Sequence, residues 1–309
     1  MRILVVGGSG LIGAHVVQVL RERGHGVTSL ARTAAPGVDH AVDLGAATPD
    51  ELRALLDGHD GVVHAGRSEE ERSRPRPIHP ALRGEMVEPI VRLFTAARAA
   101  GLTRGVVMGS YYTHFHRLHP EWRLPERHVY IRCRVEQAAE ARAAAGPALP
   151  VAVVELPFVF GRAGDRLPNW APPLARWARG RAPMLAPPGG TAAVSVRSVA
   201  ETTADALERG SGEDLPVADE NLAWRDMLAR IAAAAGHPRP VRRLPGGLLR
   251  AATRLGGALQ SLTGKESGIN ASYAAGLLLA ELFVDPPSGR ELDTAIRETF
   301  MERNVTPDL

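Results

Sequence analysis

Cysteine, lysine and long apolar runs are nearly absent from this chain of 309 residues, and each shortage excludes a class of protein. Cys133 is the only cysteine, so neither an internal disulfide nor a zinc site built from several thiolates can form. The apolar runs, such as residues 274–282, are too short to cross a bilayer. The first one runs directly into glycines, unlike a signal peptide. We therefore expect a cytoplasmic protein without a membrane partner.

The chain also has only a small excess of charge of one sign. The formal net charge is +3, and acidic and basic residues alternate over short distances, which predicts no nucleic-acid partner. Lys265 is the only lysine among 37 basic residues, so every other basic residue is arginine. With 45% hydrophobic and 23% charged residues, the composition is that of a globular protein with a substantial core.

Short apolar runs alternate with helix-like segments through residues 1–160. Strands are expected at 3–6, 27–30, 41–44, 62–64, 105–108 and 151–156, and helices at 11–23, 49–56, 84–100 and 129–145. Apolar strands separated by helices predict an α/β fold with a doubly wound parallel sheet of the Rossmann type. Residues 161–309 are less regular. They predict a small C-terminal substrate-binding lobe, interleaved with the first domain and able to add segments to its sheet.

The strongest signal is the run Gly-Gly-Ser-Gly-Leu-Ile-Gly at residues 7–13, between the first strand and the first helix. Gly7 permits a tight turn, Gly10 lets the backbone approach a pyrophosphate, and Gly13 permits close helix–strand packing. N–H groups at the helix start, at Leu11 and Ile12, then face the anion. An ordinary glycine-rich turn is the alternative, but the flanking strand and helix favour a dinucleotide site.

Cofactor choice is expected to depend on the end of the second strand. NAD sites usually place an acidic residue there, whereas this chain has Arg32, whose guanidinium suits a 2′-phosphate. We predict NADP(H) in preference to NAD, although Arg32 is one arginine among many. Asp43 and Leu44, after the third strand, are predicted beside the adenine. Ala65 and Gly66, after the fourth, are predicted along the central part of the cofactor.

The Gly-x-x-Gly-x-x-Gly spacing and several later segments resemble the extended short-chain dehydrogenase/reductase family, which includes nucleotide-sugar epimerases and dehydratases. The similar segments are residues 60–66, 105–110, 156–161, 194–201 and 222–227, in the family's order. The resemblance covers nearly the whole chain and implies an NAD(P)-dependent enzyme. It places Pro157 among the cofactor contacts and implies a homodimer through the helices 84–100 and 129–145.

Members of that family carry Tyr-x-x-x-Lys on the helix after the fifth strand. Here Tyr130 is present, but Arg134 stands at the lysine position, one helical turn away. The resemblance implies that Tyr130 handles the proton at the substrate oxygen. Arg134 keeps a positive charge that favours phenolate and offers donors to ribose hydroxyls, but it stays protonated and relays no proton. The alternative is that both residues only pack against the cofactor.

The family's catalytic Ser/Thr falls near the end of the fifth strand, and several hydroxyls compete for that role here. Ser110 ends the strand, Tyr111 has the matching position, and Thr113 has the matching chemistry. Tyr112 lies between them. This crowding indicates an altered active site, in which either tyrosine could act as acid or base.

Histidines at 114, 116, 119 and 128 do not share a helix face, so no metal is predicted. Residues 114–125 are expected to form a loop beside the substrate cleft, in which a histidine could carry a proton. Glu155 and Phe158 replace polar family residues, which argues against a nucleotide sugar and favours a more apolar small molecule. Phe158, Phe160 and two tryptophans either line the pocket or pack in the core.

Three functions are consistent with these features. The first is an NADP(H)-dependent oxidoreductase acting on a carbonyl or alcohol of a small organic molecule. The second is an NAD(P)-dependent epimerase or dehydratase without net redox change. The third is a non-catalytic NADP-binding regulator, suggested by the missing lysine.

Overall fold

The computed structural model describes residues 1–66 and 73–301, and its larger sheet has seven parallel strands. Their order is β11-β7-β6-β4-β1-β2-β3, so β1 lies between β2 and β4 where the chain reverses its direction of travel across the sheet. The strands are β1 (Arg2–Val6), β2 (Gly26–Ala31), β3 (His40–Ala41), β4 (Gly61–His64), β6 (Arg104–Met108), β7 (Val151–Glu155) and β11 (Asp214–Pro216). This confirms the predicted doubly wound parallel sheet.

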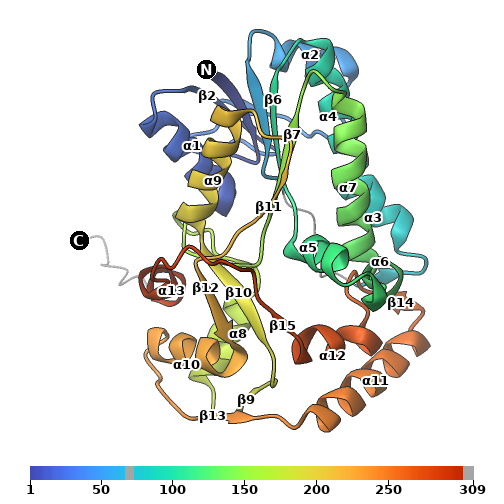
Figure 1. Cartoon of the computed structure of the whole chain (residues 1–309), viewed down its shortest axis with the longest axis vertical. Helices are drawn as coiled ribbons and strands as arrows, with labels where there is room; N and C mark the ends of the chain where they lie inside the picture. The colour runs from blue at the N-terminus through green and yellow to red at the C-terminus, as the bar shows by residue number, and fades with distance from the viewer. Residues whose placement is uncertain (67–72, 302–309) are drawn as a thin grey trace.

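Helices cover both faces of this sheet (Figure 1). One face carries α1 (Leu11–Glu22) and α9 (Val196–Arg209), and the other carries α2 (Pro49–Leu56), α4 (Glu88–Ala99) and α7 (Val129–Ala145). Alternating residues of β1 pack into the two cores on opposite faces of the sheet. Ile3 and Val5 pack in the core with α1 and α9, and Leu4 and Val6 pack in the core on the opposite face. Both faces are therefore buried, as apolar parallel strands require.

Two expected elements differ from the structure. The helix expected at 84–100 is two helices, α3 (His79–Met86) and α4, which meet at Val87. Pro89 has no N–H for the preceding turn, so a continuous helix would lose a hydrogen bond there. The loop expected at 114–125 is wrong as well. This region forms α5 (Tyr111–Leu118), the 3-10 turn η1 (Pro120–Trp122) and α6 (Leu124–Arg127). The buried side chains of Tyr111 and Phe115, one helical turn apart, hold α5 against the protein.

The second lobe is centred on β10 (Gly190–Ser195). Antiparallel β12 (Glu220–Ala223) pairs with one edge, and parallel β8 (Phe158–Phe160) and β15 (Glu281–Leu282) pair with the other. Helices α8 (Ala171–Arg179), α10 (Trp224–Ala234) and α13 (Asp293–Phe300) enclose a core with this sheet. Residues 302–309, the end of the expected lobe, lie outside the described residues.

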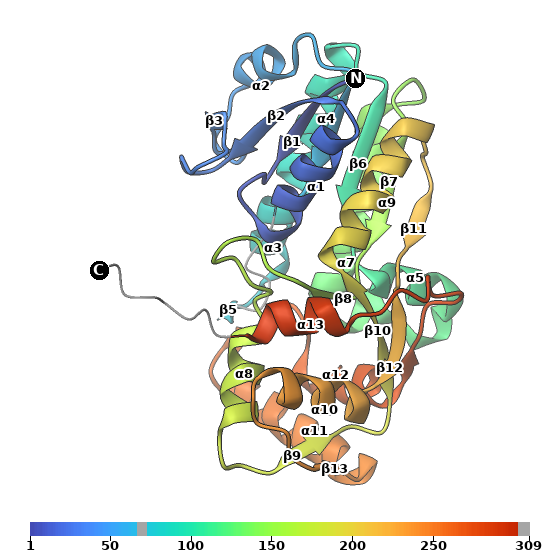
Figure 2. The same cartoon turned by 90° about the vertical axis from the view of Figure 1, so that its left-hand side faces the viewer.

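The outer end of this lobe is mostly helical. Helix α11 (Gly246–Leu262) packs beside α12 (Ala271–Leu279), far from the large sheet (Figure 1, Figure 2). Two small strand pairs complete it: β9 (Met184–Ala186) with β13 (Val241–Arg243), and β5 (Arg74–Pro75) with β14 (Lys265–Glu266). Among the described residues, no helix combines the length and apolar character needed to traverse a bilayer.

The chain crosses between the lobes more than once. It leaves β7 for β8 through Pro157, and it returns to the large sheet as α9 and β11 (Figure 2). Helix α9 packs directly on α1. The carboxyl ends of β1, β4, β6 and β7 therefore lie between the two lobes, where ligands of doubly wound folds bind.

Candidate active site

The glycine loop is packed too tightly for side chains. Gly7 adopts φ of +84° and donates its N–H to the Leu30 carbonyl at 2.7 Å. A Cβ on Gly7 would lie 2.7 Å from the carbonyl carbon of Ala65, and one on Gly13 would lie 2.1 Å from the Gly7 carbonyl oxygen. The turn after β1 is thus fixed against both the end of β4 and the start of α1. Only glycine fits at these two positions.

The start of α1 leaves its N–H groups available to an anion. Gly10 is the N-cap residue, it provides no side-chain cap, and the first turn contains no acidic residue. The Gly10 N–H donates to Gly7 at 2.9 Å, which folds the loop back over the helix start. The N–H groups of Leu11 and Ile12 follow directly, at the positive end of the helix dipole. This arrangement fits the pyrophosphate of a dinucleotide.

The other predicted cofactor residues lie along the same edge of the sheet. Arg32 is exposed and directly follows β2. Asp43 accepts the Gly45 N–H at 2.9 Å, and it is exposed just beyond β3. Leu44 has its side chain in the core, while its carbonyl accepts from Arg92 at 3.0 Å. Leu44 therefore has only backbone to offer a ligand.

The end of β4 connects the glycine loop with the predicted catalytic pair. Ala65 donates its N–H to Val6 at 2.9 Å, and a Cβ on Gly66 would lie 3.0 Å from the His64 ring. Burial, aided by the positive charge of Arg134, lowers the pKa of His64 to about 4. The His64 ring is consequently neutral near pH 7, and the charge of Arg134 reaches this end of β4.

Tyr130 and Arg134 form a direct pair on the first turns of α7. The Arg134 Nε donates to the Tyr130 hydroxyl oxygen at 3.1 Å, and the guanidinium carbon lies 5.2 Å from the ring centroid. The Arg134 guanidinium also donates to the Met108 carbonyl at 3.0 Å and to Gln137 at 2.9 Å. Gln137 is itself fixed by the Met86 carbonyl at 2.8 Å. The side chain of Arg134 is therefore held in one orientation.

Two further tyrosines at the start of α5 lie close to this pair. The rings of Tyr111 and Tyr112 are 4.7 Å apart, and the Tyr111 hydroxyl lies 3.0 Å from that of Thr191 on β10. Burial raises the pKa of Tyr111 to about 12 and that of Tyr112 well above its ordinary value, and the nearby Tyr130 contributes in the same direction. Both hydroxyls therefore stay protonated near pH 7 and act as donors.

The hydroxyl of Thr113 is bonded to groups other than the Tyr130–Arg134 pair. Its hydroxyl is 2.7 Å from the Ser110 carbonyl and also donates to the Glu155 carboxylate. Ser110 itself is the buried N-cap residue of α5 and makes no side-chain capping bond. Of the candidate hydroxyls, the structure brings Tyr111 and Tyr112 together with Tyr130, and it does not bring Thr113 there.

Glu155 is the centre of an ion-pair network behind the tyrosines. Its fully buried carboxylate receives two hydrogen bonds from Arg117, at 2.8 and 2.7 Å. Arg117 also pairs with Asp214 at 3.0 Å, and Asp214 pairs with Arg142 at 2.8 Å. This network ties α5, β7, β11 and α7 together. No local pattern in the sequence indicates Arg117 or Thr191 as partners, because each contact joins residues far apart in the chain.

One group of potential metal ligands occurs among the described residues: His79, Cys133 and Glu136, whose ligand atoms lie within 4.8 Å of one another. The Glu136 carboxylate is already paired with His79 at 3.0 Å and with Arg132 at 2.8 Å. Burial raises the pKa of the Cys133 thiol to about 11, so it stays protonated. We explain this group as a buried thiol beside an ion pair. It contains none of the histidines singled out in the sequence.

The aromatic residues of the second lobe pack with one another. Phe160 is fully buried, and its ring centroid lies 4.9 Å from that of Trp170. The ring centroid of Phe158 lies 5.3 Å from those of both Trp170 and Trp224. These rings belong to the core of the lobe, which is the second of the two roles considered for them.

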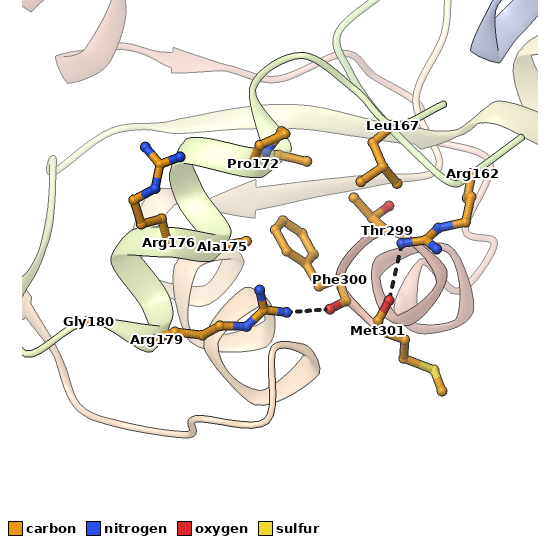
Figure 3. Close-up of a pocket in the computed structure, with 11 residues that line it drawn as sticks. Arg162, Leu167, Pro172, Ala175, Arg176, Arg179, Gly180, Thr299, Phe300 and Met301 are labelled. Carbon is orange, nitrogen blue, oxygen red and sulfur yellow. Dashed lines mark hydrogen bonds between the residues drawn. The ribbon is translucent and has the colours of Figure 1, made fainter. Parts of the chain in front are cut away.

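A cavity of about 520 Å³ lies elsewhere, between α8 and the end of α13 (Figure 3). Arg162 and Arg179 donate there to the carbonyls of Met301 and Phe300, at 3.1 and 3.2 Å, and so cap the last turn of α13. None of the predicted cofactor or catalytic residues lines this cavity. The candidate active site therefore lies at the carboxyl ends of the strands and not in this cavity.

Comparison with known proteins agrees with the interpretation of the glycine loop as a dinucleotide-binding motif. Residues 7–147 match the NAD(P)H-binding family. This part of the chain is similar to NAD(P)H-binding domains. It includes the glycine loop, the ends of β4 and β6, and the Tyr130–Arg134 pair. No curated protein sequence matches the chain.

Solved structures share the fold over most or all of the chain. UDP-N-acetylglucosamine 4-epimerase from Bacillus cereus is similar at 14% identity and a TM-score of 0.69, covering 100% of this chain and 98% of that one. A human epimerase family protein solved with NADPH is 20% identical, with a TM-score of 0.65 and coverage of 97% and 99%. A short-chain dehydrogenase/reductase superfamily protein from Agrobacterium tumefaciens with bound NAD is 18% identical, with a TM-score of 0.61 and coverage of 79% and 85%. The Rossmann-type fold that the resemblance implied is thus confirmed.

Proposed function

We propose that this protein is an NADP(H)-dependent oxidoreductase acting on a carbonyl or alcohol of a small organic molecule. The observation that carries the proposal is the Tyr130–Arg134 pair, in which a guanidinium donates directly to the phenolic oxygen. The pair lies on α7, between β6 and β7, within the residues that match the NAD(P)H-binding family. A bound nicotinamide would supply or accept the hydride.

The hydrogen bonds around Tyr130 orient its proton. Its oxygen accepts from Arg134, so the hydroxyl proton points away from the guanidinium and toward a bound substrate oxygen. When Tyr130 gives up that proton, the negative charge remains on an oxygen already bonded to a fixed cation. Arg134 therefore stabilises charge and does not carry the proton, because arginine stays protonated.

Tyr111 and Tyr112 take the place of the usual Ser/Thr donor in this proposal. Their raised pKa values keep them protonated, and Tyr111 is buried whereas Tyr112 is partly exposed. Tyr111 is bonded to Thr191, which fixes its hydroxyl. A substrate oxygen beside Tyr130 would thus meet neutral phenol donors, which favour a carbonyl over a charged group. Thr113, engaged by Glu155, is left out of this role.

Substitution of Tyr130 tests the chemistry. Carbonyl compounds are first screened for NADPH consumption with the wild-type protein. Tyr130→Phe should then lower kcat about 100- to 10,000-fold, while NADPH affinity stays within about twofold, because only the proton donor is removed. Tyr273→Phe, an exposed tyrosine on α12, is the matched control and should leave kcat unchanged. Unchanged turnover by Tyr130→Phe would refute the mechanism.

Cofactor preference is tested separately at Arg32. We propose that this exposed guanidinium binds the 2′-phosphate of NADP(H). Arg32→Ala should weaken NADPH binding by about 1.5–3 kcal/mol and leave NADH binding unchanged, as measured by calorimetric titration. Arg53→Ala, an exposed arginine on α2, serves as control. Equal losses for both cofactors at Arg32→Ala would contradict the assignment.

An epimerase or dehydratase remains the second candidate, because solved structures with this fold include enzymes named as 4-epimerases. Such an enzyme retains its cofactor through purification and shows turnover without net NADPH consumption. A non-catalytic NADP-binding regulator, the third candidate, would bind NADPH but show no Tyr130-dependent turnover with any substrate in the screen.

A further inference from the structure

Helix α11 exposes an apolar face that nothing in the described structure covers. Its buried residues are Leu249 and Gly257. Four of its leucines are largely exposed and are called the leucine stripe: Leu248 at 62%, Leu255 at 63%, Leu259 at 57% and Leu262 at 83%. These are four of the nine large apolar side chains exposed in the described residues. The exposure is therefore concentrated on one helix.

The leucine stripe is straight. Its members are seven, four and three residues apart, and at about 3.6 residues per turn these steps return to one side of the helix. The stripe extends over about 20 Å, taking 1.5 Å per residue. Helix α11 lies at the end of the molecule farthest from the large sheet in both views (Figure 1, Figure 2). A straight apolar stripe at one end of the protein can contact a flat surface along its whole length.

The opposite side of α11 is anchored to the protein. A Cβ on Gly257 would lie 2.0 Å from the Ser272 hydroxyl, so the glycine allows α11 to approach the start of α12 closely. Gln260 lies 3.3 Å from the Ser267 hydroxyl in the following turn. The orientation of the leucine stripe is thus set by these contacts, with the stripe facing away from them.

The charge around α11 is mainly positive, and Glu266, which lies beside the helix, is paired with Arg76 at 3.3 Å. Residues 227–265 contain no Asp or Glu. Arg242 and Arg243 precede the helix, Arg254 lies on it about a third of a turn from the leucine stripe, and Lys265 follows it. All of them are exposed. Two copies of the chain meeting through α11 would bring these cations close together, which disfavours self-association.

From these observations we propose that α11 docks in the surface of an anionic lipid bilayer, with the leucine stripe in the acyl boundary and the basic residues at the headgroups. An exposed leucine face with flanking cations is the pattern of helices that lie in a membrane interface without crossing it. The proposal stands apart from the cofactor chemistry, since α11 contains none of the proposed catalytic residues.

Vesicle binding tests the proposal directly. The full-length protein is mixed with vesicles of phosphatidylcholine alone or with phosphatidylglycerol added, and bound protein is measured by flotation. Binding to the anionic vesicles that weakens as NaCl rises is expected, with little binding to phosphatidylcholine. Leu259→Asp should weaken it at least tenfold, and Arg254→Ser about fivefold.

Leu118→Asp is the matched control, because Leu118 on α5 has the same exposure of 57% as Leu259. It should bind vesicles like the wild type. NADPH titration and thermal unfolding verify that every variant is folded, and failure to bind NADPH would concern the proposed function only. Three results overturn the proposal: no binding to anionic vesicles, binding that Leu259→Asp and Arg254→Ser leave unchanged, or a dimer in light scattering that Leu259→Asp dissociates.

Discussion

The two ends of the candidate site are built from different chemical groups. The cofactor end is backbone: Gly7 and Gly13 are packed against carbonyl groups, and α1 presents its N–H groups. The catalytic end is made of side chains from several elements, with Tyr130 and Arg134 on α7 and Thr191 on β10. Backbone geometry demands one residue type, whereas side-chain chemistry can be rebuilt from different residues.

This difference explains which end departs from the family pattern. The glycine loop keeps its spacing because a Cβ at Gly13 would lie 2.1 Å from the Gly7 oxygen. At the catalytic end, arginine replaces lysine and still reaches the tyrosine oxygen, at 3.1 Å. Glu155, which replaces a polar family residue, is paired with Arg117. Side-chain contacts can be rebuilt from other residues, but a close backbone contact has no substitute.

Removal of Glu155 should have the largest effect on stability. Glu155→Ala takes away a fully buried carboxylate that holds Arg117 and Thr113. We expect the free energy of unfolding to fall by about 3 kcal/mol, measured by chemical denaturation. Glu208→Ala, which breaks an exposed pair with Arg23, should cost less than about 1 kcal/mol. Similar losses for the two variants would mean that the buried network does not hold the catalytic end together.

A methyl group in the glycine loop should have a smaller effect on stability and a large one on binding. Gly13→Ala forces a Cβ against the Gly7 carbonyl, and we expect about 2 kcal/mol of destabilisation with at least a tenfold loss of NADPH affinity. Gly84→Ala on α3 meets no atom within 4 Å and is the control. If Gly13→Ala bound NADPH normally, the cofactor end would not depend on backbone fit.

A similar contrast, between local spacing and contacts of distant residues, explains which features could be predicted from the sequence. The sheet, the glycine loop and the pairing of Tyr130 with Arg134 follow from local spacing, because neighbours in sequence or on one helical turn determine them. The contact between Tyr111 and Thr191 joins residues 80 positions apart, and the bond of Thr113 to Glu155 spans 42. No local pattern indicates such partners, so the choice among the hydroxyls after β6 stayed open.

Two other features were missed although their signals were present. The turn spacing of Tyr111 and Phe115 favours α5, whereas the expectation from the sequence is a loop at 114–125. The leucine stripe of α11 also follows a helical period, but no helix is predicted at residues 246–262 from the sequence. Periodicity shows which face is apolar, and only the structure shows whether that face is buried.

The smallest predicted effect is a pH dependence confined to the catalytic end. His128 precedes α7, its ring accepts the Asn270 N–H at 3.1 Å, and burial lowers its pKa to about 4 from 6.5. Between these values the unfolded chain binds a proton that the folded chain does not, so stability falls as pH falls through this range. His64, with its pKa also lowered to about 4, acts in the same direction.

We expect His128 alone to reduce the free energy of unfolding by about 1 kcal/mol between pH 7 and pH 5.5. Denaturation at the two pH values measures this difference. His128→Gln should flatten the slope by that amount, because its amide oxygen can accept the Asn270 N–H without titrating. His237→Gln, at an exposed position, should leave the slope unchanged. The glycine loop contains no titratable group, so a wild-type slope in His128→Gln would place the pH sensitivity at other side chains, and not at the helix that carries Tyr130.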